Sequence, residues 1–126
     1  MKLHEIKGSE VMDFADFIQG SQWIPKKHRE AFEKLGNALF KKGFKLHTNN
    51  NLRFSKEDGA DPHGWTIGFP YARRFNDGVE MMYTGYDDEH SQLLVGRAYF
   101  TLDEIETFGL DTCLENVKKL AAWKPT

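Results

Sequence analysis

The densest group of residues able to do chemistry is the run Asp87, Asp88, Glu89 and His90, which follows Tyr86. Carboxylates and imidazoles bind metal ions and transfer protons. A metal site needs ligands that converge, whereas four consecutive residues in a strand or turn point in different directions. The run also lacks the alternating acids and central glycine of a calcium-binding EF-hand loop. We therefore interpret it as the polar tip of a hairpin, and we expect no metal ion and no cofactor.

A second polar loop places Asp61 two residues before His63. A carboxylate beside a histidine can orient it as a general base, so a small hydrolase or nuclease stays open as an alternative. The chain has none of the usual short motifs for a nucleophilic serine, a phosphate-binding loop, a dinucleotide, a zinc protease or a paired-cysteine site. Its five histidines are scattered singly. We assign no catalytic residue, and the sequence favours a protein that is not an enzyme.

Basic and aromatic residues meet in the stretch "YARRF", which contains Arg73 and Arg74. Arginines beside aromatic rings bind phosphate and stack on bases. The helix predicted over 26–42 adds Lys26, Lys27 and Arg29, which could contact phosphates. An RNA- or DNA-binding module is therefore a second alternative, although the net charge of −2 is unlike the basic balance typical of such domains.

Charge is unevenly distributed along the chain. Residues 1–56 hold 11 basic and 6 acidic residues, whereas residues 57–126 hold 6 and 13. The segment 77–115 contains ten acidic residues and one basic residue, Arg97, which gives a net charge of −9. Fields of one sign steer partners of the opposite sign.

The acidic half favours a small interaction protein, of the inhibitor or immunity type, that binds a basic partner protein. Tyrosines with charged rims are typical of protein interfaces. We expect the partner-binding residues to be Tyr83, Tyr86, Asp87, Asp88, Glu89, Asp103 and Glu104.

Hydrophobic periodicity predicts the elements that position these residues. Apolar residues recur with helical spacing over 11–18, after a capping Ser9, and again from Pro25 to about Lys42. Alternation with a period of two then predicts strands near 44–48, 52–54, 65–71, 79–86 and 92–100, with "FNDG" as a hairpin turn. "TLDE" from Thr101 is a capping-box pattern opening a short helix that ends near Gly109. A last helix, capped by Asp111, should bury Leu114, Val117, Leu120 and Ala121.

Strands grouped between terminal helices predict an α+β fold: an antiparallel four- or five-stranded meander, with two N-terminal helices and one or two C-terminal helices packed on it. The length suits a single α+β domain over 1–126. A lone cysteine, Cys113, excludes an intramolecular disulfide and should lie in the core. No apolar run approaches the length of a membrane span, so we expect a cytoplasmic protein without membrane contact.

Overall fold

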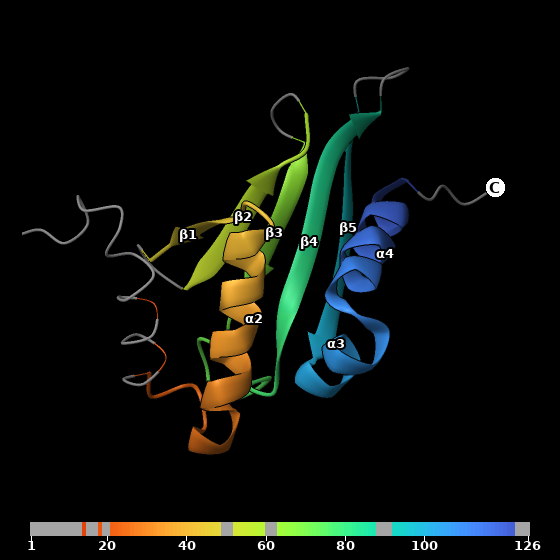
Figure 1. The fold of residues 1–126 in the computed structure, drawn as a ribbon. Helices are drawn as coiled ribbons and strands as arrows, with labels where there is room; N and C mark the ends of the chain where they lie inside the picture. Colours follow the sequence, from red (N-terminus) through yellow and green to blue (C-terminus); the bar gives the residue numbers. More distant parts are fainter. Residues whose placement is uncertain are drawn as a thin grey trace, which may run out of the picture.

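The computed structural model describes residues 14, 18, 21–48, 52–59, 63–87 and 92–122. Five antiparallel strands form one sheet in the order β1-β2-β3-β4-β5, and the three described α-helices lie on one side of it (Figure 1). The α+β class and the antiparallel meander are confirmed. In chain order the elements are η2 (Lys26–His28), α2 (Arg29–Lys41), β1 (Lys45–His47), β2 (Arg53–Glu57), β3 (Gly64–Gly68), β4 (Gly78–Asp87), β5 (Gln92–Thr101), α3 (Leu102–Phe108) and α4 (Leu110–Ala122).

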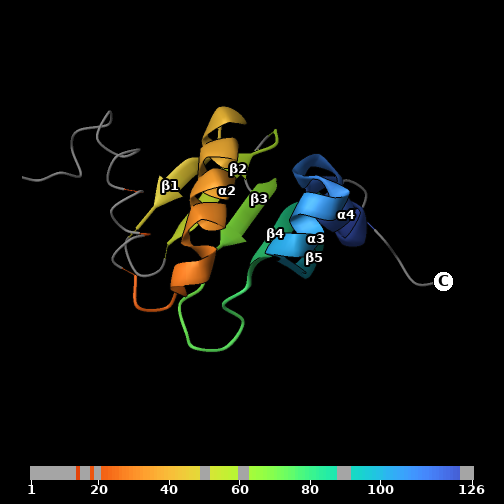
Figure 2. The ribbon, with the colours of Figure 1, turned by 60° about the horizontal axis from the view of Figure 1, so that its bottom comes forward.

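Strand alternation puts the large apolar side chains on one face of the sheet. Phe54, Ile67 and Met81 are neighbours across β2, β3 and β4, and all three are fully buried. Trp65 and Tyr83 form the next row on that face. Because successive residues point to opposite faces, their chain neighbours form a second face, which no described helix covers (Figure 2).

Helix α2 packs on the buried face as its apolar spacing predicts. Phe32, Leu35 and Leu39 are buried, and the Phe32 ring centroid lies 5.4 Å from that of Phe69. The helix begins at Arg29 instead of Pro25, because the preceding residues form the 3-10 turn η2. It ends at Lys41, and the positive φ of 94° at Gly43 lets the chain reverse into β1.

The first predicted helix lies almost entirely outside the described residues, as does its predicted cap Ser9. Two of its apolar positions, Phe14 and Ile18, are helical and buried. The Phe14 ring lies edge-on to Phe40, Phe54 and Phe69, with centroids 5.5–5.9 Å apart. These two residues therefore join the same core.

The C-terminal helices cover β4 and β5. The capping box that opens α3 is present: Glu104 N–H donates to Thr101 Oγ1 over 3.1 Å, and Thr101 N–H donates to the Glu104 carboxylate over 2.9 Å. Helix α4 lies on Gly96 of β5 so closely that a Cβ there would stand 2.1 Å from the Val117 carbonyl oxygen. The Trp65 Nε1–H donates to the Leu114 carbonyl over 3.0 Å, which ties α4 to β3.

Two details of α4 differ from the sequence prediction. Leu120 is 43% exposed, whereas Leu114, Val117 and Ala121 are buried as predicted, together with Cys113. Asp111 does not cap the helix: it lies in the first turn and forms an ion pair with Lys42 at the end of α2. Leu120 follows the buried Cys113 by seven residues, on the same side of the helix, so its exposure depends on its place along α4.

The loop between β3 and β4 is longer than the predicted hairpin turn, since it runs from Phe69 to Asp77. β3 ends at Gly68, so Pro70 lies in a loop and not in a strand. This placement agrees with the missing N–H of proline, which cannot join a strand ladder. The positive φ in the loop, 56°, belongs to Phe75 and not to the Asn-Asp-Gly residues that follow it.

No helix in the described part of the chain is long and apolar enough to cross a membrane.

The contact at Gly96 predicts an unequal response of two strand glycines to alanine. Gly96→Ala should lower the free energy of unfolding by about 1–3 kcal/mol, because the methyl group would push the backbone of α4 off the sheet. Gly68→Ala is the matched control, since a Cβ there meets only the Glu80 carbonyl oxygen at 4.0 Å. Urea denaturation of both variants measures the difference, and equal stabilities would contradict the close packing of α4.

Candidate functional site

The acidic run that suggested a metal site begins at the end of a hairpin. Asp87 is the last residue of β4 and pairs with Gln92, the first residue of β5. The other members of the run, Asp88, Glu89 and His90, lie outside the described residues. Among the residues that the structure describes, no three His, Cys, Asp or Glu side chains are grouped to hold a metal ion.

His63 lies against β4. Its ring packs on Gly85, where a Cβ would come within 2.7 Å of the imidazole, and its Nε2 accepts the Tyr86 N–H over 3.2 Å. Asp61 lies outside the described residues. The nitrogen that a general base would use is therefore engaged with backbone, and the hydrolase alternative gains no support from this position.

Tyr83 is buried, so its predicted place on a partner surface is wrong. Its hydroxyl donates to Asp58 Oδ2 over 2.6 Å, and its exposed fraction is 6%. Lys118 of α4 reaches the same carboxylate oxygen over 3.0 Å and lies over the rings of Trp65 and Tyr83. Burial and the Asp58 bond raise the pKa of Tyr83, whereas the Tyr83 bond and Lys118 lower the pKa of Asp58. This polar cluster links the β2–β3 loop, β4 and α4. We therefore interpret it as part of the contacts that hold the fold together and not as a binding site.

The exposed acids gather on the C-terminal helices. We define the acidic helix surface as the outward side of α3 and the first half of α4, where residues 102–117 contain no lysine or arginine. Phe108, at the end of α3, is 53% exposed among these acids, one helical turn after Glu104. The exposed acids of this surface are Asp103, Glu104, Glu106, Asp111 and Glu115.

Sequence reasoning included Asp103 and Glu104 but missed Phe108. Nothing in "LDEIETF" marks Phe108 as exposed. It follows the buried Ile105 by three residues, a spacing that predicts the same side of the helix.

The basic residues of the nucleic-acid alternative come from three different elements. Lys26 and Lys27 are exposed on η2, beside α2, on the helix-covered side of the sheet. Arg73 and Arg74 are exposed on the β3–β4 loop. Arg74 lines a hollow on the uncovered face of the sheet, whereas Arg29 is half-buried and its Nε is buried without a hydrogen-bond partner.

We define the open sheet face as the side of the strands opposite α2, α3 and α4. Its rows run across all five strands: His47, Arg53, Gly68, Glu80 and Tyr99 are register neighbours in one of them. His47 Nε2 lies 2.6 Å from Ser55 Oγ, and Arg97 Nε lies 3.8 Å from the Glu80 carboxylate. Tyr86, predicted to be exposed, lies on this face and is 48% exposed.

A scan against protein-family models finds no match, and searches of curated proteins and of solved structures find none either.

The bond between Asp58 and Tyr83 predicts a pH-dependent contribution to stability. The pKa of Asp58 is lower in the folded protein than its ordinary value, so the carboxylate stabilises the fold above that ordinary value, and the contribution is lost as pH falls through the folded pKa. Asp58→Asn should therefore lower the free energy of unfolding at pH 7 more than at about pH 2. Glu57→Gln, at the neighbouring exposed carboxylate, is the control. A deficit of the Asp58 variant that is equal at both pH values would rule out a role for the charge.

Proposed function

We propose that this protein is a small non-enzymatic binding protein that holds a basic partner protein against the acidic helix surface. The observation that carries the proposal is Phe108, a large aromatic side chain 53% exposed at the end of α3, within a stretch, residues 102–117, that contains no lysine or arginine. Interfaces commonly combine a central aromatic anchor with a charged rim. Asp103 and Glu104 keep the role expected of them, whereas Tyr83 leaves the set.

The separation of charge supports a basic partner. Exposed lysines lie on η2 and α2, for example Lys27 and Lys34, and exposed acids lie on α3 and α4. Within the acidic helix surface, Asp111 is bound to Lys42, the residue that follows α2. Among the described residues, no lysine or arginine forms an ion pair with the acids of α3. A basic partner approaching this side meets a field of one sign, which raises the rate of association.

An inhibitor or immunity-type role follows from the chemistry of such a partner. Proteins that bind nucleic acids do so with basic surfaces. A small acidic protein that covers such a surface competes with the phosphate backbone and blocks its partner.

Charge reversal on α3 tests the electrostatic part of the proposal. Glu106→Lys should slow association with the partner several-fold at low salt, and the difference from wild type should shrink at high salt, where the Debye length falls to about 3 Å. Glu30→Lys makes the same change in net charge on α2 and should have little effect. Affinity purification from cell extract with the three baits, followed by kinetic measurements on the recovered protein, gives the comparison. Equal effects of the two reversals would place the interface elsewhere.

Truncation of the aromatic side chain tests the anchor. Phe108→Ala should weaken partner binding by roughly 30-fold, the loss expected at an interface hot spot. The control is Leu93→Ala, which removes a similarly exposed apolar side chain, 52% exposed, from the end of β5. Calorimetric titration of the recovered partner measures both, with thermal melts to show that each variant is folded. A Phe108 variant with wild-type affinity would remove the anchor from the proposal.

A further inference from the structure

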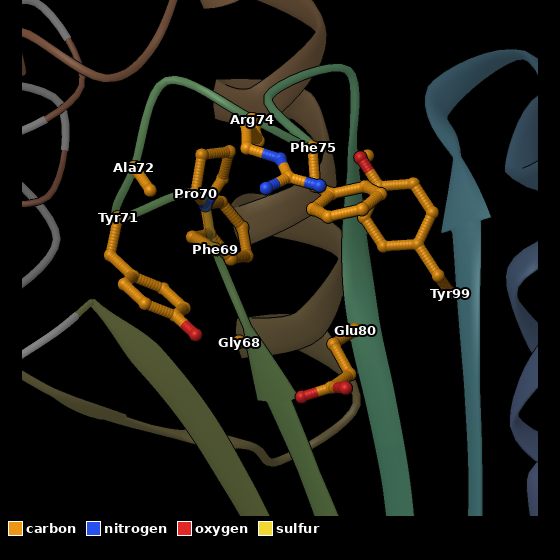
Figure 3. Close-up of a pocket in the computed structure, with 10 residues that line it drawn as sticks. Gly68, Phe69, Pro70, Tyr71, Ala72, Arg74, Phe75, Glu80 and Tyr99 are labelled. Carbon is orange, nitrogen blue, oxygen red and sulfur yellow. The ribbon is translucent and has the colours of Figure 1, made fainter.

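A hollow of about 350 Å³ lies on the open sheet face, at the end where the β3–β4 loop rises over the strands. Figure 3 shows Tyr71 on one side of it, Phe75 and Tyr99 on the other, and Arg74 and Glu80 at its two ends. Gly68 leaves the floor without a side chain. The walls are therefore aromatic rings, and the ends carry a guanidinium group and a carboxylate.

The walls are held in place by specific contacts. The Tyr99 hydroxyl donates to Asp77 Oδ1 over 2.6 Å, and the Phe75 and Tyr99 ring centroids lie 5.6 Å apart. The Arg74 guanidinium carbon lies 5.5 Å from the centre of the Phe75 ring. Asp77 also accepts the Leu102 N–H at its carbonyl oxygen, which joins this end of the loop to the start of α3.

Phe75 occupies an unfavourable conformation without gaining burial. Its φ is 56°, in the left-handed region that costs a side chain with a Cβ, and it is 67% exposed. Aromatic residues normally lower the free energy by being buried, so neither local backbone preference nor the core explains this placement. Backbone strain of this kind gathers at binding sites.

The charges around the hollow favour an anionic ligand. Arg53 lies in the same register row as Glu80, and Arg97 lies in the next row on this face. Arg73 and Arg74 lie on the loop between β3 and β4. Glu80 and Asp77 oppose these four arginines, and the Asp77 carboxylate already accepts the Tyr99 hydroxyl. Lys45 continues the positive charge to the far edge of the sheet, on the same face as Arg97.

We infer that the open sheet face binds a single-stranded nucleic acid, with one base stacked in the hollow between Tyr71 and Phe75 and the phosphates over Arg74, Arg97 and Arg53. Exposed rings on an open sheet stack on unpaired bases, and arginines beside them neutralise the backbone. The Glu80 carboxylate can accept hydrogen bonds from the amino groups of a base. A duplex would keep its bases out of the hollow, and a basic protein would be repelled by the arginines, so this site is separate from the acidic helix surface.

The test measures the fluorescence anisotropy of a labelled, mixed-sequence single-stranded RNA and its DNA counterpart as the full-length protein is added. The same sequence as a duplex and a free mononucleotide are the comparison ligands. We expect the single strands to bind more tightly than either, with an affinity that falls as salt is raised.

Two substitutions in the hollow should weaken binding while the fold is kept. Phe75→Gly removes the stacking ring together with the backbone strain, so binding should weaken about tenfold while the melting temperature stays within a few degrees of wild type. Arg74→Gln should weaken binding to all sequences alike and lower the salt slope by about one. The matched controls lie on the helix side: Phe108→Ala for the ring and Lys34→Gln for the charge.

Several results would overturn the inference. One is that the wild-type protein does not bind single strands. Another is that it binds the duplex or the mononucleotide as tightly as the single strand. A third is that a folded Phe75→Gly protein binds the single strand as tightly as wild type. A larger loss with Lys34→Gln than with Arg74→Gln would move the contact to the basic helix.

Discussion

The alternation of inward- and outward-facing residues in β2 to β5 is the constraint on which the rest of this structure depends. It places Phe54, Ile67, Met81 and Tyr83 on one face, and a sheet with one apolar face must bury that face against something. All three described α-helices are therefore found on the same side. The opposite face carries polar side chains, exposed aromatic ones and the exposed Leu93 and Val95, so the two faces of the sheet differ in chemistry.

The two helical groups on the covered side differ in charge because they come from different parts of the chain. α2 derives from the basic first half and α4 from the acidic second half, and the sheet brings them onto the same face. The Lys42–Asp111 ion pair bridges them where the end of α2 meets the start of α4. Residues 26–42 hold 6 basic and 2 acidic residues, whereas residues 102–122 hold 2 basic and 5 acidic ones, so the net charge of −2 describes the surface poorly.

Much of the fold followed from local patterns, because those patterns are set by near neighbours. The bounds of β4 and β5, the apolar side of α2 and the Thr101–Glu104 capping box needed only periodicity and cap chemistry. Tyr83 was misplaced because its burial depends on Asp58 and Lys118, which reach it from distant parts of the chain. Leu120 was misplaced because helical spacing gives the side of α4 on which a residue lies, but not which part of the helix is covered by its neighbours.

The candidate sites were harder to predict than the elements for a related reason. The hollow beside Phe75 combines residues of three strands, β3, β4 and β5, with a loop, so they can be grouped only once the strand register is known. Sequence reasoning found Arg73 and Arg74 but not the strand residues, Glu80 and Tyr99, that line the hollow with Arg74. Phe75 itself was assigned to a tight turn, since nothing in a sequence marks a phenylalanine with positive φ.

The strand order has a consequence for how quickly the chain folds. Each strand pairs with its immediate neighbour in sequence, so the sheet can grow by successive hairpins that each close a short loop. Folds dominated by contacts of this kind have a low relative contact order and fold faster than sandwiches of similar size, in which distant strands must find one another. Helix α4 contacts both β4 and β5, so its packing is complete only once these two strands have paired. Docking of the acidic helices would then complete the fold after the open face has formed.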